Sequence, residues 1–202
     1  NVYLYASDNS GSNGYAYFPT PFSYDTWYHI AVVFDGTESA QTDKIVMYID
    51  GVKQTNTGSS NTIGSTLGSM TSDITIGKRG YVNNNYHFNG LQDEVVFYNK
   101  ALTSSEVSAL YNGGSGTITP DTNGLIAHYN FEQAGNILES QIDVPPTNTK
   151  LLGLNDVTFS VNPTSASVVE TVTTTSNAWD FDGSNDYVNL GTGIANALAN
   201  TD

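Results

Sequence analysis

The chain has 202 residues, a length at which a β-sandwich or barrel often folds as one large domain. Its 20 acidic residues outnumber its 6 basic residues, and the net charge of -14 argues against nucleic acid and anionic membrane surfaces as partners, because both are bound through clustered lysine and arginine. The absence of cysteine excludes disulfides, thiolate zinc sites and a thiol nucleophile.

The first four predicted strands come as two pairs joined by turn-forming residues. They are predicted at residues 2–5, 15–18, 27–34 and 45–49. A Ser/Asn/Gly-rich stretch separates the first pair, which indicates a hairpin. The later pair ends in Asp35-Gly36 and Asp50-Gly51, and Asp-Gly tolerates the positive φ angles of a tight hairpin turn. We interpret both dipeptides as turns rather than calcium ligands.

Loop, strand and linker signals occupy the middle of the chain. Residues 56–72 are rich in Gly, Ser, Thr and Asn and predict a loop, which is followed by strands at 74–77 and 94–98. Residues 113–121 lack periodicity and are predicted to be a linker. Beyond the linker, residues 125–132 predict a further strand.

A single helix is predicted just before the linker. Thr103 and Glu106 form a capping box, in which the Thr103 hydroxyl accepts from the Glu106 amide while the Glu106 carboxylate accepts from the Thr103 amide. Gly113-Gly114 is predicted to end the helix. The apolar residues of one helical face are Val107, Leu110 and Tyr111.

The order and spacing of these signals resemble the laminin-G-like, concanavalin A-like jelly rolls, a family of lectins, adhesion modules and a few glycanases. The resemblance is carried by the runs WYHIAVVFDG at 27–36, IVMYIDG at 45–51 and FNGLQDEVVFY at 88–98, the last leading into the capped helix. It implies an all-β fold, an antiparallel β-sandwich of the jelly-roll type with one short helix.

The segments of this family's domain occur in this chain in permuted order. Residues 1–112 resemble the later part of a laminin-G-like jelly roll, and residues 122–202 resemble its opening part. The chain either straddles the boundary between two domains of a tandem array or closes on itself as one permuted domain. The sequence begins inside a strand pattern, and we expect it to be a segment of a longer protein.

We favour the closed sandwich, because half a sandwich exposes too much apolar sheet to be stable alone. This hypothesis predicts that the strand at 125–131 pairs in the same sheet as the strand at 94–98. It also predicts that Phe97 and Phe131 are buried in the core that these strands share.

The resemblance further implies a calcium ion at the end of the sandwich. In the family an acidic residue after the opening strand and the Asp of the Gly-x-x-Asp-Glu-Val strand often bind it, and these positions match Glu132 and Asp93. Calcium prefers several oxygen ligands, with carboxylates mixed with backbone carbonyls. The alternative is that Asp93 caps a turn and Glu132 is solvated. Asp143 is a third candidate ligand.

Aromatic and amide side chains suggest a saccharide site, because sugar faces stack on tyrosine while asparagine binds hydroxyl groups. The loop at 81–86 has this composition, and its candidate ligand-binding residues are Tyr81, Asn84 and Tyr86. Further stacking candidates are Tyr15, Tyr17 and Tyr24. The alternative is that these tyrosines pack at sheet edges, as they do in many β-sandwiches.

We therefore expect an extracellular or bacterial cell-surface module that binds glycans or matrix and surface proteins, stabilised by calcium and without membrane insertion. The alternative is a structural spacer of a bacterial surface adhesin or filament, in contact with neighbouring repeats of the same protein. Catalysis is not expected, because glycanases of this fold carry paired carboxylates, typically as Glu-x-Asp-x-x-Glu. That run is absent.

Overall fold

The structure is a computed structural model, and its described residues form antiparallel sheets with one α-helix, α1 (Ser104–Tyr111). The predicted all-β antiparallel class with one short helix is therefore confirmed. Contacts divide the chain into two compact units, Asn1–Ser69 with Lys100–Thr117 and Met70–Asn99 with Ile118–Asp202. The described residues are 2–7, 13–19, 22–68, 74–79, 86–117, 119–131, 158–159, 164–169, 175–182 and 187–190.

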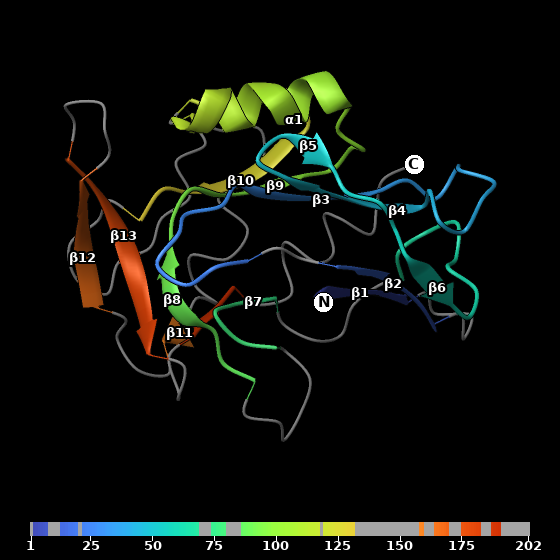
Figure 1. The fold of residues 1–202 in the computed structure, drawn as a ribbon, viewed down its shortest axis with the longest axis horizontal. Coiled ribbons are helices and arrows are strands. Elements are labelled where there is room, and N and C mark those ends of the chain that lie inside the picture. Colours follow the sequence, from blue (N-terminus) through green and yellow to red (C-terminus); the bar gives the residue numbers. More distant parts are fainter. Residues whose placement is uncertain are drawn as a thin grey trace, which may run out of the picture. The chain divides into compact units, whose positions relative to one another are not determined.

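Two three-stranded sheets pack face to face in the first unit (Figure 1). One sheet has the order β1-β2-β6, with strands β1 (Val2–Ser7), β2 (Asn13–Phe18) and β6 (Gly58–Ser60). The other has the order β3-β4-β5, with strands β3 (Ile30–Phe34), β4 (Ile45–Ile49) and β5 (Val52–Lys53). The buried residues between the sheets are Ala6, Ala16, Phe18, Ile45, Met47, Ile49 and Ile63.

Helix α1 covers the opposite face of the β3–β4 pair (Figure 1). Side chains alternate between the two faces of a strand, so Met47 enters the core between the sheets while Tyr48 faces the helix. Val107, which has no exposed surface, packs from α1 against Tyr48 and Val33. The first unit thus has three layers, two sheets and a helix.

The two Asp-Gly dipeptides form different connections. Asp50 and Gly51, with φ angles of 50° and 73°, form the predicted tight turn between β4 and β5. Asp35-Gly36 also lies in a turn, as predicted, since the Glu38 amide donates to the Asp35 carbonyl at 3.4 Å, but this turn begins a longer connection to β4 instead of a two-residue hairpin. Thr37 donates to Asp35 Oδ1 through its amide at 3.0 Å and its hydroxyl at 2.6 Å, which fixes a local Asp turn.

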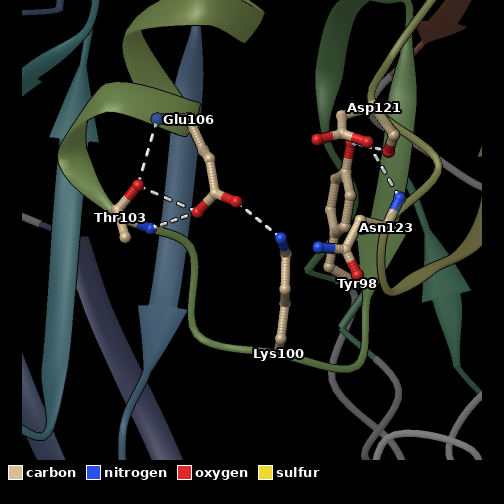
Figure 2. A network of polar contacts seen from close by, with 6 residues as sticks. All are labelled: Tyr98, Lys100, Thr103, Glu106, Asp121 and Asn123. Carbon is tan, nitrogen blue, oxygen red and sulfur yellow. Dashed lines mark hydrogen bonds and ion pairs between the residues drawn. The ribbon is translucent and has the colours of Figure 1, made fainter.

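The predicted capping box of α1 is confirmed (Figure 2). The Glu106 amide donates to Thr103 Oγ1 at 3.3 Å, and the Thr103 amide donates to Glu106 Oε2 at 2.7 Å. Lys100 Nζ lies 2.5 Å from Glu106 Oε1. This hydrogen bond, followed by those from Thr103, lowers the pKa of Glu106 to about 2. The helix ends at Tyr111, its C-cap Asn112 has a left-handed conformation, and Gly113 follows with φ 64°.

The described residues of the second unit form three sheets. They have the orders β10-β9, β11-β14-β7 and β12-β13-β8. The strands that precede the linker are β7 (Thr75–Ile76), β8 (Asn89–Gln92) and β9 (Val95–Tyr98). Those that follow it are β10 (Leu125–Tyr129), β11 (Thr158–Phe159), β12 (Thr164–Val169), β13 (Thr175–Asp182) and β14 (Val188–Asn189).

The predicted pairing of the strand at 125–131 with the strand at 94–98 is confirmed, because β10 pairs antiparallel with β9. Strand β13 likewise pairs with β8, and β14 with β7. Phe131 is fully buried and Phe97 packs partly buried against the same core. The buried residues of this core are Ile76, Ala127, Tyr129, Phe131, Trp179, Phe181, Val188 and Leu190. Whether the parent protein is permuted or a tandem array stays a prediction.

The turn that leads into β10 is tied to β9 by polar contacts (Figure 2). The Tyr98 hydroxyl donates to the Asp121 carbonyl at 2.9 Å. The Asn123 amide donates to Asp121 Oδ1, also at 2.9 Å, so Asp121 shapes the turn just before β10 begins.

Several predicted elements have different bounds in the structure. The strand predicted at 27–34 begins three residues later, at Ile30, and the strand predicted at 74–77 spans Thr75–Ile76. The predicted loop at 56–72 contains strand β6, because the Gly58–Ser60 backbone pairs with β2. The strand predicted at 94–98 begins one residue later, since Glu94 has φ 52° and this left-handed conformation separates β8 from β9.

Candidate functional site

A group of four tyrosines covers the outer face of the β1–β2 hairpin, and we call it the tyrosine face. Its members are Tyr3, Tyr5, Tyr15 and Tyr17. Register explains their grouping, since Tyr3 pairs with Tyr17 and Tyr5 pairs with Tyr15. Directly paired residues of an antiparallel ribbon project from the same face. The residues between them point into the core, so every tyrosine of the hairpin is turned outward.

The rings of the tyrosine face contact one another in a continuous series. The centroids of Tyr3 and Tyr17 lie 5.9 Å apart with an interplanar angle of 29°, which is a stacked arrangement. Tyr15 lies 5.9 Å from Tyr3 and 5.3 Å from Tyr5, with tilted planes. Such contacts restrict the motion of each ring. Tyr3 and Tyr5 nevertheless remain 51% and 66% exposed, so their aromatic surface is available to a ligand.

Strand β6 supports one end of the tyrosine face. A β-carbon at position 58 would lie only 2.3 Å from Cε1 of Tyr17, so glycine is required for the ring to lie against this backbone. The Thr57 amide also donates to the Tyr17 carbonyl at 3.1 Å. Together these contacts fix Tyr17 at the border of the site.

The saccharide candidates predicted from sequence have different positions. Tyr15 and Tyr17 belong to the tyrosine face, whereas Tyr81 and Asn84 lie outside the described residues. Tyr86 is exposed in the second unit, with the Arg79 guanidinium 5.7 Å from its ring centroid. The ligand role of these residues stays a prediction.

Tyr3 and Tyr5 are the candidate site residues that the sequence analysis missed. The signal was the repeated Tyr-x-Tyr pattern in both strands of one predicted hairpin, at residues 3–5 and 15–17. Successive side chains of a strand point to opposite faces, so this pattern places both tyrosines of each strand on one face. All four rings then share a face when the hairpin register pairs them.

The calcium prediction concerns the start of β9. Asp93 Oδ1 accepts from the Glu94 amide at 2.9 Å, and Glu94 Oε2 lies 2.5 Å from Nε2 of the buried His128. Among the described residues no group of three or more His, Cys, Asp and Glu side chains could hold a metal ion. Glu132 and Asp143 lie outside those residues, so the calcium site stays a prediction with Asp93 as its described member.

The first unit also contains a histidine next to the β4–β5 turn. The His29 amide donates to Asp50 Oδ1 at 2.9 Å, and its ring lies 5.8 Å from that of Tyr111. Burial lowers the pKa of His29 below its usual value, although the Asp50 carboxylate partly opposes the shift. The ring is therefore neutral at pH 7 and contributes packing rather than charge.

These features define an antiparallel β-sheet protein in which a sandwich presents an aromatic outer face. The chain belongs to the concanavalin A-like lectin/glucanases superfamily, because the family's laminin-G-type model matches residues 1–108, more than half of the chain. The resemblance inferred from sequence is thereby confirmed. No curated protein and no solved structure matches the chain. Among the described residues, no helix has the length and apolar character needed to cross a membrane.

Proposed function

We propose that the chain is a carbohydrate-binding or adhesion module at the bacterial cell surface or in the extracellular space. Family membership supports a module of this kind, and the tyrosine face is the observation that carries the proposal. Four mutually packed rings provide an ordered apolar surface for the faces of sugar residues. Their hydroxyl groups can donate to and accept from sugar hydroxyls.

Electrostatics favours a neutral ligand for the tyrosine face. Its four tyrosine side chains supply no cation, and the whole chain carries a net charge of -14. A polyanionic glycan would therefore meet repulsion without a compensating cation on this face. We infer that neutral oligosaccharides bind there in preference to sulfated or uronic acid-rich ones.

Binding without catalysis is part of this proposal, and so is structural calcium. The residues that would hold calcium are Asp93 and Glu132, and the ion would supply charge neutralisation and a fixed loop geometry rather than reaction chemistry. Matrix or surface proteins that carry suitable glycans are then the natural partners.

A glycan array with the wild-type chain and the double variant Tyr3→Ala/Tyr5→Ala tests the proposal. Both side chains are more than half exposed, so the variant should fold with little change in melting temperature. We expect at least about a fivefold loss of affinity for each ring removed, from aromatic contact energies near 1 kcal/mol. Tyr86→Ala is the comparison variant, since it removes an exposed tyrosine of the second unit and tests the alternative saccharide candidate there.

The outcome also separates the proposal from its alternatives. If Tyr86→Ala abolishes binding while the Tyr3/Tyr5 variant binds normally, the ligand site lies at the predicted loop 81–86 instead. If the wild-type chain binds no glycan at millimolar concentration, the spacer or assembly role replaces the binding role.

A further inference from the structure

The turn between β2 and β3 displays three aromatic side chains in addition to the tyrosine face. We call it the aromatic turn, residues 22–28. Tyr24 is 99% exposed, Trp27 is 50% exposed and Phe22 is 41% exposed. Exposed tyrosine and tryptophan side chains combine a flat apolar ring with a polar group at its edge, which suits them to stacking against the faces of sugar rings.

The backbone of the aromatic turn is held in place by its own contacts. The Ser23 amide donates to the Tyr28 hydroxyl at 3.0 Å, and the Thr26 hydroxyl donates to the Tyr24 carbonyl at 3.1 Å. The Phe22 ring lies 5.0 Å from that of Tyr28, which packs in turn against the core of the first unit. The exposed rings are thus attached to an ordered support, which lowers the entropy cost of binding through them.

A carboxylate accompanies these rings. Asp25 is exposed and lies between Tyr24 and Trp27 in the chain, with φ 56°. Aspartate tolerates this left-handed conformation better than most residues. A carboxylate accepts two hydrogen bonds at once, so it can bind two adjacent hydroxyl groups, whereas it repels an anionic ligand.

We propose that the aromatic turn is a second saccharide-binding site, which takes a neutral sugar residue with a pair of adjacent hydroxyl groups. The sugar face stacks on Tyr24 and Trp27, and the Asp25 carboxylate accepts from the hydroxyl pair. The inference rests on the proposed function in one respect, namely that the chain binds carbohydrate. It goes further in assigning a separate site whose selectivity against acidic sugars is set by one carboxylate.

Tryptophan fluorescence can observe this site directly. The chain contains two tryptophans, and Trp179 is only 1% exposed, so ligand-dependent emission and acrylamide quenching report on Trp27. Methyl glucoside, methyl galactoside, methyl mannoside and methyl glucuronide are the probes, titrated to millimolar concentration. We expect saturable protection of Trp27 by at least one neutral glycoside and weaker protection by the glucuronide. Trp27→Phe is the control, because its remaining emission comes from the buried Trp179 and should not respond.

Three variants test the assigned roles without disturbing the fold. Tyr24→Ala removes a side chain with almost no packing and should weaken neutral-sugar binding at least about fivefold, whereas Tyr24→Phe keeps the ring and should bind nearly as the wild type. Asp25→Asn keeps a residue that tolerates the turn conformation. It should weaken neutral-sugar binding about tenfold, through loss of charge-assisted hydrogen bonds, and reduce the discrimination against glucuronide.

The inference and the proposed function can fail separately. If glycans bind on the array while Trp27 emission is unchanged and Tyr24→Ala binds normally, the second site is overturned and the proposed function stands. If no saccharide binds in either assay, both are overturned. Variants that alter self-association but leave sugar binding intact would instead identify the aromatic turn as a protein contact and also overturn the inference.

Discussion

Replacing Phe131 by alanine tests how the segment after the linker is integrated into the fold. Phe131 follows β10, has no exposed surface and lies 5.2 Å from the Trp179 ring between centroids. Replacing a fully buried phenylalanine by alanine lowers the free energy of unfolding by about 3–5 kcal/mol, because apolar burial is lost and a cavity is left behind. The neighbouring Trp179 is itself buried and large, so it cannot easily move to fill the cavity. We therefore expect Phe131→Ala to lower the free energy of unfolding by about 4 kcal/mol.

Urea unfolding followed by tryptophan emission measures this cost. The Trp27→Phe background leaves Trp179 as the only tryptophan, so the transition reports on the second unit. Phe88→Ala is the control, because Phe88 is 43% exposed and contacts Phe181 from the edge of the same core; it should cost less than about 2 kcal/mol. A Phe131→Ala cost below about 1 kcal/mol, or one equal to that of Phe88→Ala, would refute the shared core.

Three further predictions concern backbone strain, acid stability and calcium. Gly77→Ala should destabilise by more than about 1 kcal/mol in urea unfolding, since φ is 81° and the new β-carbon would lie 2.3 Å from the Phe181 ring; an unchanged midpoint would contradict this. Because the pKa of Glu106 is lowered to about 2, chiefly by the hydrogen bond from Lys100, its stabilising effect is present above pH 4.5 and lost toward pH 2. The melting-temperature difference between wild type and Glu106→Gln should therefore shrink over that range, and a constant difference would be evidence against the capping role. If calcium binds through Asp93, a hundredfold excess over the dissociation constant should stabilise the chain by about 2.7 kcal/mol, and a melting temperature that EGTA leaves unchanged would exclude it.

Local features of the fold could be predicted because they depend on neighbouring residues alone. The capping box needs only Thr103 and Glu106 at their spacing, and the β4–β5 turn needs only Asp50 and Gly51 between two strands. Asp35 shows the limit of this reasoning. The same dipeptide begins a longer connection there, because the strands on either side are too far apart in sequence for a two-residue turn.

Features that depend on distant pairing were harder to predict. Strand β6 forms in a Gly/Ser-rich stretch because the edge of β2 supplies hydrogen-bonding partners for its backbone, which no pattern within residues 56–72 reveals. The tyrosine face was missed in part for the same reason, since its grouping depends on the register that pairs Tyr3 with Tyr17. Pairing of β9 with β10 was predicted because the resemblance divided a sandwich between two segments of the chain, and half a sandwich would expose too much apolar sheet to be stable alone.

The proposal that the tyrosine face binds carbohydrate is tested most directly by an NMR titration with assigned tyrosine ring resonances, using a neutral oligosaccharide selected on the array. We expect the ring protons of Tyr3, Tyr5, Tyr15 and Tyr17 to shift together and to saturate with one dissociation constant. Those of the buried Tyr129 should stay unchanged. Saturable binding that leaves all four rings unshifted would contradict the proposal.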